Sequence, residues 1–309
     1  MSDTTASLRR QIGSAGDLQS VVRTMKALAA SSIGQYEKSV RALGDYYRTV
    51  ELGLGACFRA SDSALAMDRP GHPDADAIGA VVFGSDQGLV GQFNDVVADF
   101  SVKTLAALPG QPKVWAVGER VQARLTDAGL PPRGLFTVPH SVQAITPLIG
   151  QILVEYEAHQ DRGEVTQLHL FYNRPTSGAV YAPVHQRLLP LDEAWRRQLA
   201  GLPWPTKPLP EIMGGRATLR ALLREYLFVS LFRACAESLA SENASRLAAM
   251  ERADRNIDEL LEDLKGDFHR LRQSGIDAEL FDVISGFEAL TGRRQPAKQV
   301  AIKPGLELS

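Results

Sequence analysis

"SLRRQIGSAGDLQSVVRTMKALAASSIGQYEKSVRALGDYYRTVELGLGACF", residues 7–58, carries an apolar or small residue at nearly every third or fourth position. A period near 3.5, held for about seven heptads, indicates a helix that packs along another helix rather than on a sheet. At 1.5 Å per residue, such a helix is roughly 75 Å long. The stripe consists of Leu8, Ile12, Ala15, Leu18, Val22, Met25, Ala29, Ile33, Tyr36, Val40, Leu43, Tyr47, Val50, Leu54 and Cys57.

The other end of the chain, residues 211–290, repeats this pattern and predicts a second helix of roughly 110 Å if it is unbroken. Pairs such as Glu242 with Arg246 have the i,i+4 spacing typical of a solvated helix face. Because neither helix is stable with an exposed apolar stripe, we expect residues 1–60 and 211–290 to pair as a long antiparallel coiled coil. Its second stripe includes Leu219, Leu223, Tyr226, Phe232, Ala236, Leu239, Leu247, Met250, Ile257, Leu260, Leu264, Phe268, Leu271, Ile276, Leu280, Ile284 and Phe287.

The middle of the chain, residues 76–195, reads differently. Short β-rich runs occur at "AIGAVVFGS", "KVWAVG", "LFTVP", "VTQLHLFYN" and "AVYAPVHQRLLPL", with helical patterns between them. This alternation predicts a central Rossmann-like α/β domain with a mainly parallel sheet, so the fold class is α/β with a coiled coil. Pro- and Gly-rich linkers bracket it at residues 67–76 and 201–215, and residues 291–309 lose the heptad and are predicted to be a flexible tail.

Composition narrows the class of protein further. The 309 residues carry a net charge of −2, which argues against a nucleic-acid binder held by bulk electrostatics. Cys57 and Cys235 are the only cysteines, and we expect both to be buried in a protein of a reducing compartment. The polar start and the lack of a run of about 18 apolar residues predict neither a secretion signal nor a membrane span.

The best candidate for chemistry is the turn "GSDQGLVGQFN", residues 84–94, where an apolar strand meets a glycine-rich segment and a helix. This order is typical of a phosphate cradle, but neither G-x-G-x-x-G nor a P-loop Lys is present, and Asp86 would repel a phosphate. The alternative is structural: the glycines supply turn geometry, and Asp86 or Ser85 caps the helix. His169 is interpreted as a packed strand residue, and no histidine spacing predicts a metal or cofactor.

Four stretches together resemble the gamma subunit of F-type ATP synthases. They are "VVRTMKALAASSI" at 21–33, "GSDQGLVGQFN" at 84–94, "LLREYLFVSLFRACAESLASE" at 222–242 and the helix from Glu237 to Leu290. The match extends over nearly the whole chain in the right order. It departs at Asp277, where bacterial relatives often have Thr, at Val90 and Gln92 in the turn, and in the added tail. These departures would suit an alternate bacterial F-type ATPase.

The resemblance implies a central-stalk rotor without an active site of its own, present in one copy per complex. Its partners would be the hexamer of alpha and beta subunits, the epsilon subunit and the membrane c-ring, on the cytoplasmic face of the bacterial inner membrane. It would couple transport of hydrogen or sodium ions to ATP synthesis or hydrolysis. The regulatory cysteine pair of the chloroplast form has no counterpart, so no thiol switch is expected.

Matching the family motif residue by residue places rotor–collar contacts at Met25 and Lys26 on the first helix and at Arg246, Gln273 and Asp277 on the last. Without the resemblance, these positions would be read as a seam methionine and solvated helix charges. Two other functions stay open at the level of sequence. One is a coiled-coil adaptor unrelated to ATP synthase, and the other is a nucleotide-binding enzyme that uses the glycine turn.

Overall fold

The computed structural model describes residues 4–60, 77–177, 180–206 and 215–291. The predicted linker at 67–76, most of the linker at 201–215 and the predicted tail after residue 291 therefore lie outside the described residues. The chain divides into two compact units. One comprises residues 1–21 with 254–309, and the other runs from Val22 to Ala253.

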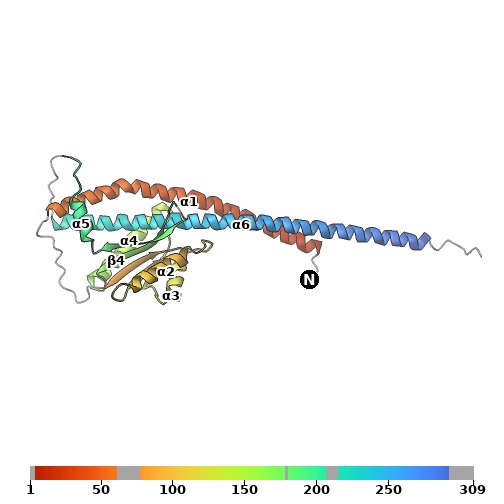
Figure 1. Cartoon of the computed structure of the whole chain (residues 1–309), viewed down its shortest axis with the longest axis horizontal. Helices are drawn as coiled ribbons and strands as arrows, with labels where there is room; N and C mark the ends of the chain where they lie inside the picture. The colour runs from red at the N-terminus through yellow and green to blue at the C-terminus, as the bar shows by residue number, and fades with distance from the viewer. Residues whose placement is uncertain (1–3, 61–76, 178–179, 207–214, 292–309) are drawn as a thin grey trace, which may run out of the picture. The chain divides into compact units, whose positions relative to one another are not determined.

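Two long helices, α1 (Thr5–Ala60) and α6 (Arg216–Thr291), confirm the helices predicted at the two ends of the chain (Figure 1). Their 56 and 76 residues correspond to roughly 84 and 114 Å if straight. In the first unit, Arg9 lies over the Phe268 ring at 5.6 Å and Gln19 donates to Asp254 at 3.3 Å. Since residue numbers rise on α1 as they fall on α6, the helices are antiparallel there.

In the second unit the two helices are again antiparallel, and their buried residues belong to a core that also includes the sheet. The Tyr46 hydroxyl donates to Glu225 at 2.6 Å, and a Cβ on Gly53 would meet the Leu222 side chain. α6 does not contact α1 alone, because buried residues of α6 such as Leu231 and Leu239 share one core cluster with Val81 and Leu170 of the sheet. The apolar stripe of α6 therefore packs on the sheet as well as on α1 in this region. A heptad stripe identifies a buried face without identifying everything that buries it.

The sheet has five strands in the order β3-β2-β1-β4-β5. All neighbours pair in parallel except β5, which runs antiparallel to β4 at one edge. The mainly parallel sheet and the five predicted strand positions are thus confirmed. The strands are β1 (Ile78–Phe83), β2 (Lys113–Val117), β3 (Gly134–Phe136), β4 (Gln167–Arg174) and β5 (Ala182–Leu189), and the shorter helices are α2 (Phe93–Ala106), α3 (Glu119–Asp127), α4 (Val142–Asp161) and α5 (Glu193–Ala200).

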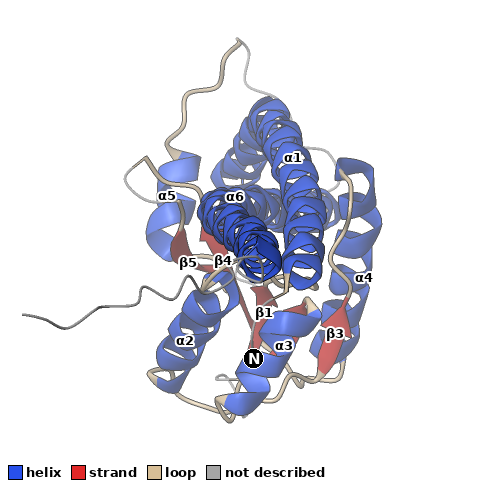
Figure 2. Ribbon diagram, turned by 90° about the vertical axis from the view of Figure 1, so that its right-hand side faces the viewer, coloured by secondary structure: helices blue, strands red, loops and turns tan. Residues whose placement is uncertain are grey.

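Helices cover both faces of the sheet, as Figure 2 shows. On one face Ala80 and Val82 pack with Val97 of α2. On the other face, Val81 and Phe83 share a cluster with α4 and with the part of the coil in this unit. Every residue of β1 is buried, as expected for a central parallel strand whose side chains alternate between two covered faces. Among the described residues, no helix combines the length and apolar character needed to cross a membrane.

Candidate functional site

The glycine turn follows β1 at the carboxyl edge of the sheet, where an α/β protein would bind a nucleotide. A Cβ on Gly84 would lie 2.3 Å from Val121 and 2.8 Å from the Asn94 amide oxygen, so glycine is required for close packing. The Asn94 side chain accepts from the Ser85 N–H at 2.9 Å and donates to the Ser85 hydroxyl at 2.9 Å. Gly91 adopts a φ of 57°, which supports the structural reading of the turn.

Asp86 does not cap the helix that follows the turn. One oxygen of its carboxylate accepts from the Glu119 N–H at 3.0 Å, at the start of α3, and the other accepts from the Val138 N–H at 2.9 Å. The N-cap position of α2, Gln92, makes no side-chain capping bond. The prediction that Asp86 or Ser85 caps that helix is therefore wrong. Because β1, β2 and β3 are parallel neighbours, their carboxyl ends meet, and Asp86 ties the loops after all three.

Helix α6 covers the crevice at the switch point between β1 and β4. The Ser245 hydroxyl donates to the Val90 carbonyl at 2.5 Å. The Ser241 hydroxyl lies 3.0 Å from the Asn173 carbonyl and 2.9 Å from the Glu237 carbonyl of its own helix, so these two acceptors share one proton. The Asn173 side chain in turn donates to the Phe93 carbonyl at 2.9 Å. In open α/β sheets this crevice receives the nucleotide, whereas here the chain's own helix occupies it.

The Glu242–Arg246 pair on α6 is buried, which corrects the expectation of a solvated pair. A guanidinium nitrogen of Arg246 lies 2.6 Å from a Glu242 oxygen, and both side chains are almost inaccessible. The second Glu242 oxygen and Arg246 Nε find no hydrogen-bond partner among the described residues. Burial raises the pKa of Glu242, and the neighbouring Arg246 opposes that rise. A polar cavity of about 120 Å³ adjoins the pair and is also lined by Asp86 and His140.

The other predicted contact residues lie in different surroundings. Met25 and Lys26 are half-buried on α1 in the second unit. Gln273 and Asp277 are exposed on α6 in the first unit, where their i,i+4 spacing places them on the same side of the helix. His169 is buried as predicted, with its Nδ1 2.8 Å from Nε2 of His185. Both cysteines are buried and unpaired, and no cluster of potential metal ligands occurs in the described residues.

The distal part of α6 is an exposed apolar surface. All residues from 269 to 290 are exposed, although the stretch keeps the apolar period of the seam. α1 begins at Thr5, and Arg9 already reaches Phe268, so the described part of α1 has little left to pack beyond that point. A contiguous apolar surface of this kind marks a site of association with another protein. Its large members are Ile276, Leu280, Phe281, Val283, Ile284, Phe287 and Leu290.

The sequence-based predictions did not include Ser241 and Ser245, two serines of α6 that contact backbone carbonyls at the edge of the sheet. The signal was present in "ESLASENAS", residues 237–245, where small side chains interrupt the large apolar residues of a helix. Small residues at helical spacing allow a helix to approach a neighbouring backbone closely. In the structure, Ser241 and Ser245 make that approach and donate to backbone carbonyls.

These features define a class of protein: a coiled-coil subunit with an α/β head and an apolar helix end presented to partners. The family model described as ATP synthase matches residues 4–290. The chain is 28% identical over 289 residues to the ATP synthase gamma chain of Anaeromyxobacter sp., covering 92% of this chain and 98% of the relative. It is 27% identical over 297 residues to that of Moorella thermoacetica, covering 92% and 98%. The chain belongs to the ATP synthase gamma family.

Solved structures support the same fold. A chain from the Euglena gracilis mitochondrial ATP synthase OSCP/F1/c-ring structure superposes with a TM-score of 0.65 at 18% identity, covering 97% of this chain and 99% of that one. A chain from the Tetrahymena thermophila central stalk and c-ring structure gives 0.51 at 20% identity, covering 75% and 99%. Because the chain belongs to this family, we reject the alternative function of a coiled-coil adaptor unrelated to ATP synthase.

Proposed function

We propose that this chain is the central-stalk rotor subunit of an F-type ATP synthase. It would couple rotation of a membrane c-ring to ATP synthesis or hydrolysis on a hexamer of alpha and beta subunits, with an epsilon subunit beside it. The observation that carries the proposal is the apolar surface of α6 from Ile276 to Leu290, which the described part of the chain leaves exposed. A collar of partner subunits would bury it.

A rotor needs no catalytic group of its own. One asymmetric helix inside a pseudo-threefold collar contacts each catalytic subunit differently, so rotation changes the nucleotide affinity of each site in turn. The nucleotides would belong to the neighbouring subunits, in agreement with the α6 serines that occupy the crevice of this chain. The complex would lie at the cytoplasmic face of a bacterial inner membrane and transport hydrogen or sodium ions.

The proposed collar contacts divide by their surroundings. Gln273 and Asp277 are exposed and can touch a partner directly, and the half-buried Met25 and Lys26 can do so at the coil surface. Arg246 is almost inaccessible and paired with Glu242, so it would act by holding its stretch of α6 in position. We further propose that residues 76–195 form the head toward the c-ring, carried by the coil of residues 1–60 and 211–290.

Reconstitution with alpha and beta subunits tests the proposal. We expect complexes with one copy of this chain per hexamer, measured by native mass spectrometry. A double variant, Phe281→Ser with Val283→Ser, should assemble at least tenfold less well while the isolated chain keeps its thermal stability, because both side chains are exposed.

The matched control is Glu279→Gln, an exposed polar position in the same stretch of α6, which should assemble normally. Normal assembly of the double variant would remove the apolar end from the interface. Failure of the unmodified chain to join the hexamer in any ratio would refute the rotor function itself.

A further inference from the structure

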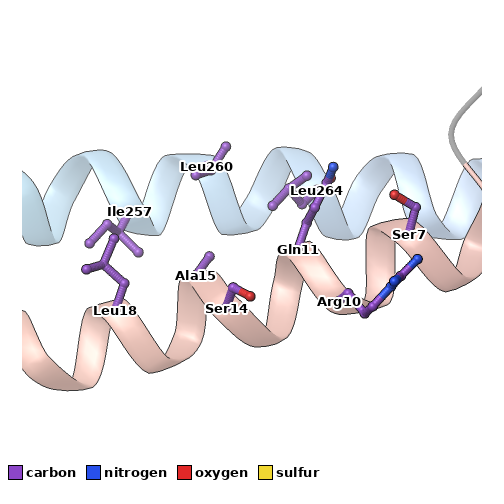
Figure 3. A pocket seen from close by; sticks show the side chains of 9 residues that line it. All are labelled: Ser7, Arg10, Gln11, Ser14, Ala15, Leu18, Ile257, Leu260 and Leu264. Carbon is purple, nitrogen blue, oxygen red and sulfur yellow. The ribbon is translucent and has the colours of Figure 1, made fainter. Parts of the chain in front are cut away.

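The first unit contains an apolar groove between the start of α1 and the facing turns of α6 (Figure 3). Its volume is about 580 Å³. Ala15 and Ile257 are buried at its floor, whereas Leu18 and Leu260 are 54% and 49% exposed although both belong to the predicted seam. Figure 3 shows Leu18 directed toward Ile257 and Gln11 toward Leu264. The polar members Ser7, Arg10 and Ser14 all come from α1.

The groove exists because the side chains of α1 are small at residues 13–16. Residues 13–16 read Gly-Ser-Ala-Gly, and an added Cβ on Gly13 or Gly16 would meet nothing within 4 Å. Leucines of α6 therefore face small side chains, and the seam is left underfilled. An interior packed to ordinary density would have filled this space with larger residues.

We propose that the chain's own segment Lys303–Ser309, "KPGLELS", covers this groove. Leu306 and Leu308 would lie against the exposed Leu18 and Leu260, and the Glu307 carboxylate would face Arg10. The docked segment masks the apolar groove in the unassembled chain.

The length of the chain permits this contact. Leu264 precedes Thr291, the last residue of α6, by 27 residues, or roughly 40 Å of helix. The 18 residues that follow Thr291 span up to roughly 60 Å when extended. A chain that turns back at Gly292 therefore reaches the groove with about its last seven residues, which include both leucines.

Charge supports this occupant. Arg10 is the only charged residue among those lining the groove, and Glu307 is the only acidic residue after Leu290. Placing Glu307 between two leucines lets the apolar side chains face the floor while the carboxylate stays at the polar rim. An alternating Leu-Glu-Leu sequence in extended conformation provides this arrangement, since successive side chains point to opposite sides.

Cysteine cross-linking in the full-length chain tests the proposal, because Cys57 and Cys235 are buried and should not react. The pair Ser14→Cys with Ser309→Cys, which keeps both leucines of the segment, should give an intramolecular disulfide under mild oxidation, seen as a monomer of altered mobility on a non-reducing gel. The control pair replaces Ser14→Cys by Ser20→Cys, an exposed serine of α1 that does not line the groove. We expect at least tenfold faster closure for the first pair.

A peptide of residues 299–309 provides the second measurement. It should bind a chain truncated after Thr291 at least tenfold more tightly than the full-length chain, whose own segment competes, and Leu306→Ser in the peptide should abolish binding. Equal cross-linking of both cysteine pairs, or equal peptide binding to both chains, overturns the proposal. Dimeric rather than monomeric cross-links would overturn it in favour of a second copy of the chain as the occupant.

Discussion

Two stretches of α6, residues 219–245 and 271–290, carry the same apolar period. The first contains many buried residues, whereas every residue of the second is exposed. In the first stretch, Leu231 is fully buried in a cluster shared with the sheet. In the second, Leu280 is 57% exposed, although it belongs to the predicted apolar stripe. The comparison shows that a heptad pattern records a face that must be covered, whereas the partner that covers it can belong to this chain or to another.

We expect the largest loss of stability at Arg246, in the buried stretch of α6. Arg246→Ala would leave the buried Glu242 carboxylate without its partner and should cost about 3–5 kcal/mol of unfolding free energy. Gln273→Ala, at an exposed position of the distal stretch, should change it by less than about 0.5 kcal/mol. Urea unfolding followed by circular dichroism measures both. Equal costs would mean that Arg246 is not held in a buried pair in solution.

A second pair of variants makes the same substitution in both stretches. Leu231→Ala should destabilise the isolated chain by about 2–5 kcal/mol, since it leaves a cavity in the core. Leu280→Ala should stay within about 0.5 kcal/mol, because its side chain is already in water. Denaturant midpoints of the two variants check this. A large loss for Leu280→Ala would show that the distal stretch is covered in the free chain.

The buried histidine His169 on β4 makes the stability of the fold depend on pH. Burial, with contributions from His185 and Arg187, lowers the pKa of His169 to about 4. Because an unfolded histidine has a pKa near 6.5, this group stabilises the fold fully above about pH 6.5, and the contribution is lost as the pH falls toward 4. The loss should be roughly 3 kcal/mol.

His169→Gln should flatten this part of the stability profile, measured by urea unfolding between pH 7.5 and 4.5. The control Gln273→Ala, at an exposed position on α6 without a titratable side chain, should leave the profile unchanged. Identical profiles for the two variants would contradict the buried, neutral state of His169.

The smallest effect is expected at Asp86. Asp86→Ala removes the acceptor of two backbone N–H groups and should cost about 1–3 kcal/mol. Asp95→Ala breaks a surface pair with Arg124 at 2.7 Å and should cost less than about 1 kcal/mol. Thermal unfolding can rank the two variants. If Asp86→Ala were the milder one, the carboxylate would not be holding the loops together.

The sequence predicts the long helices, the five strands and the parallel sheet because each depends on a local period that burial enforces. It does not predict the role of Asp86, since that carboxylate bonds backbone groups 33 and 52 residues away and a local pattern favours the nearest helix. The burial of Glu242 and Arg246 was missed for a related reason. Their i,i+4 spacing is the same on a solvated face and on a face covered by loops from another part of the chain.

The serines that seat α6 on the head also determine how the molecule can bear a twisting load. The Ser241 and Ser245 hydroxyls are one helical turn apart and lie within hydrogen-bond distance of carbonyls on two different segments of the head, at Asn173 and Val90. A slip of one residue turns an α-helix by about 100° and would withdraw both hydroxyls from their acceptors. These two contacts therefore oppose rotation of α6 about its own axis relative to the head. A torque applied to the head would act on the Asn173 and Val90 carbonyls.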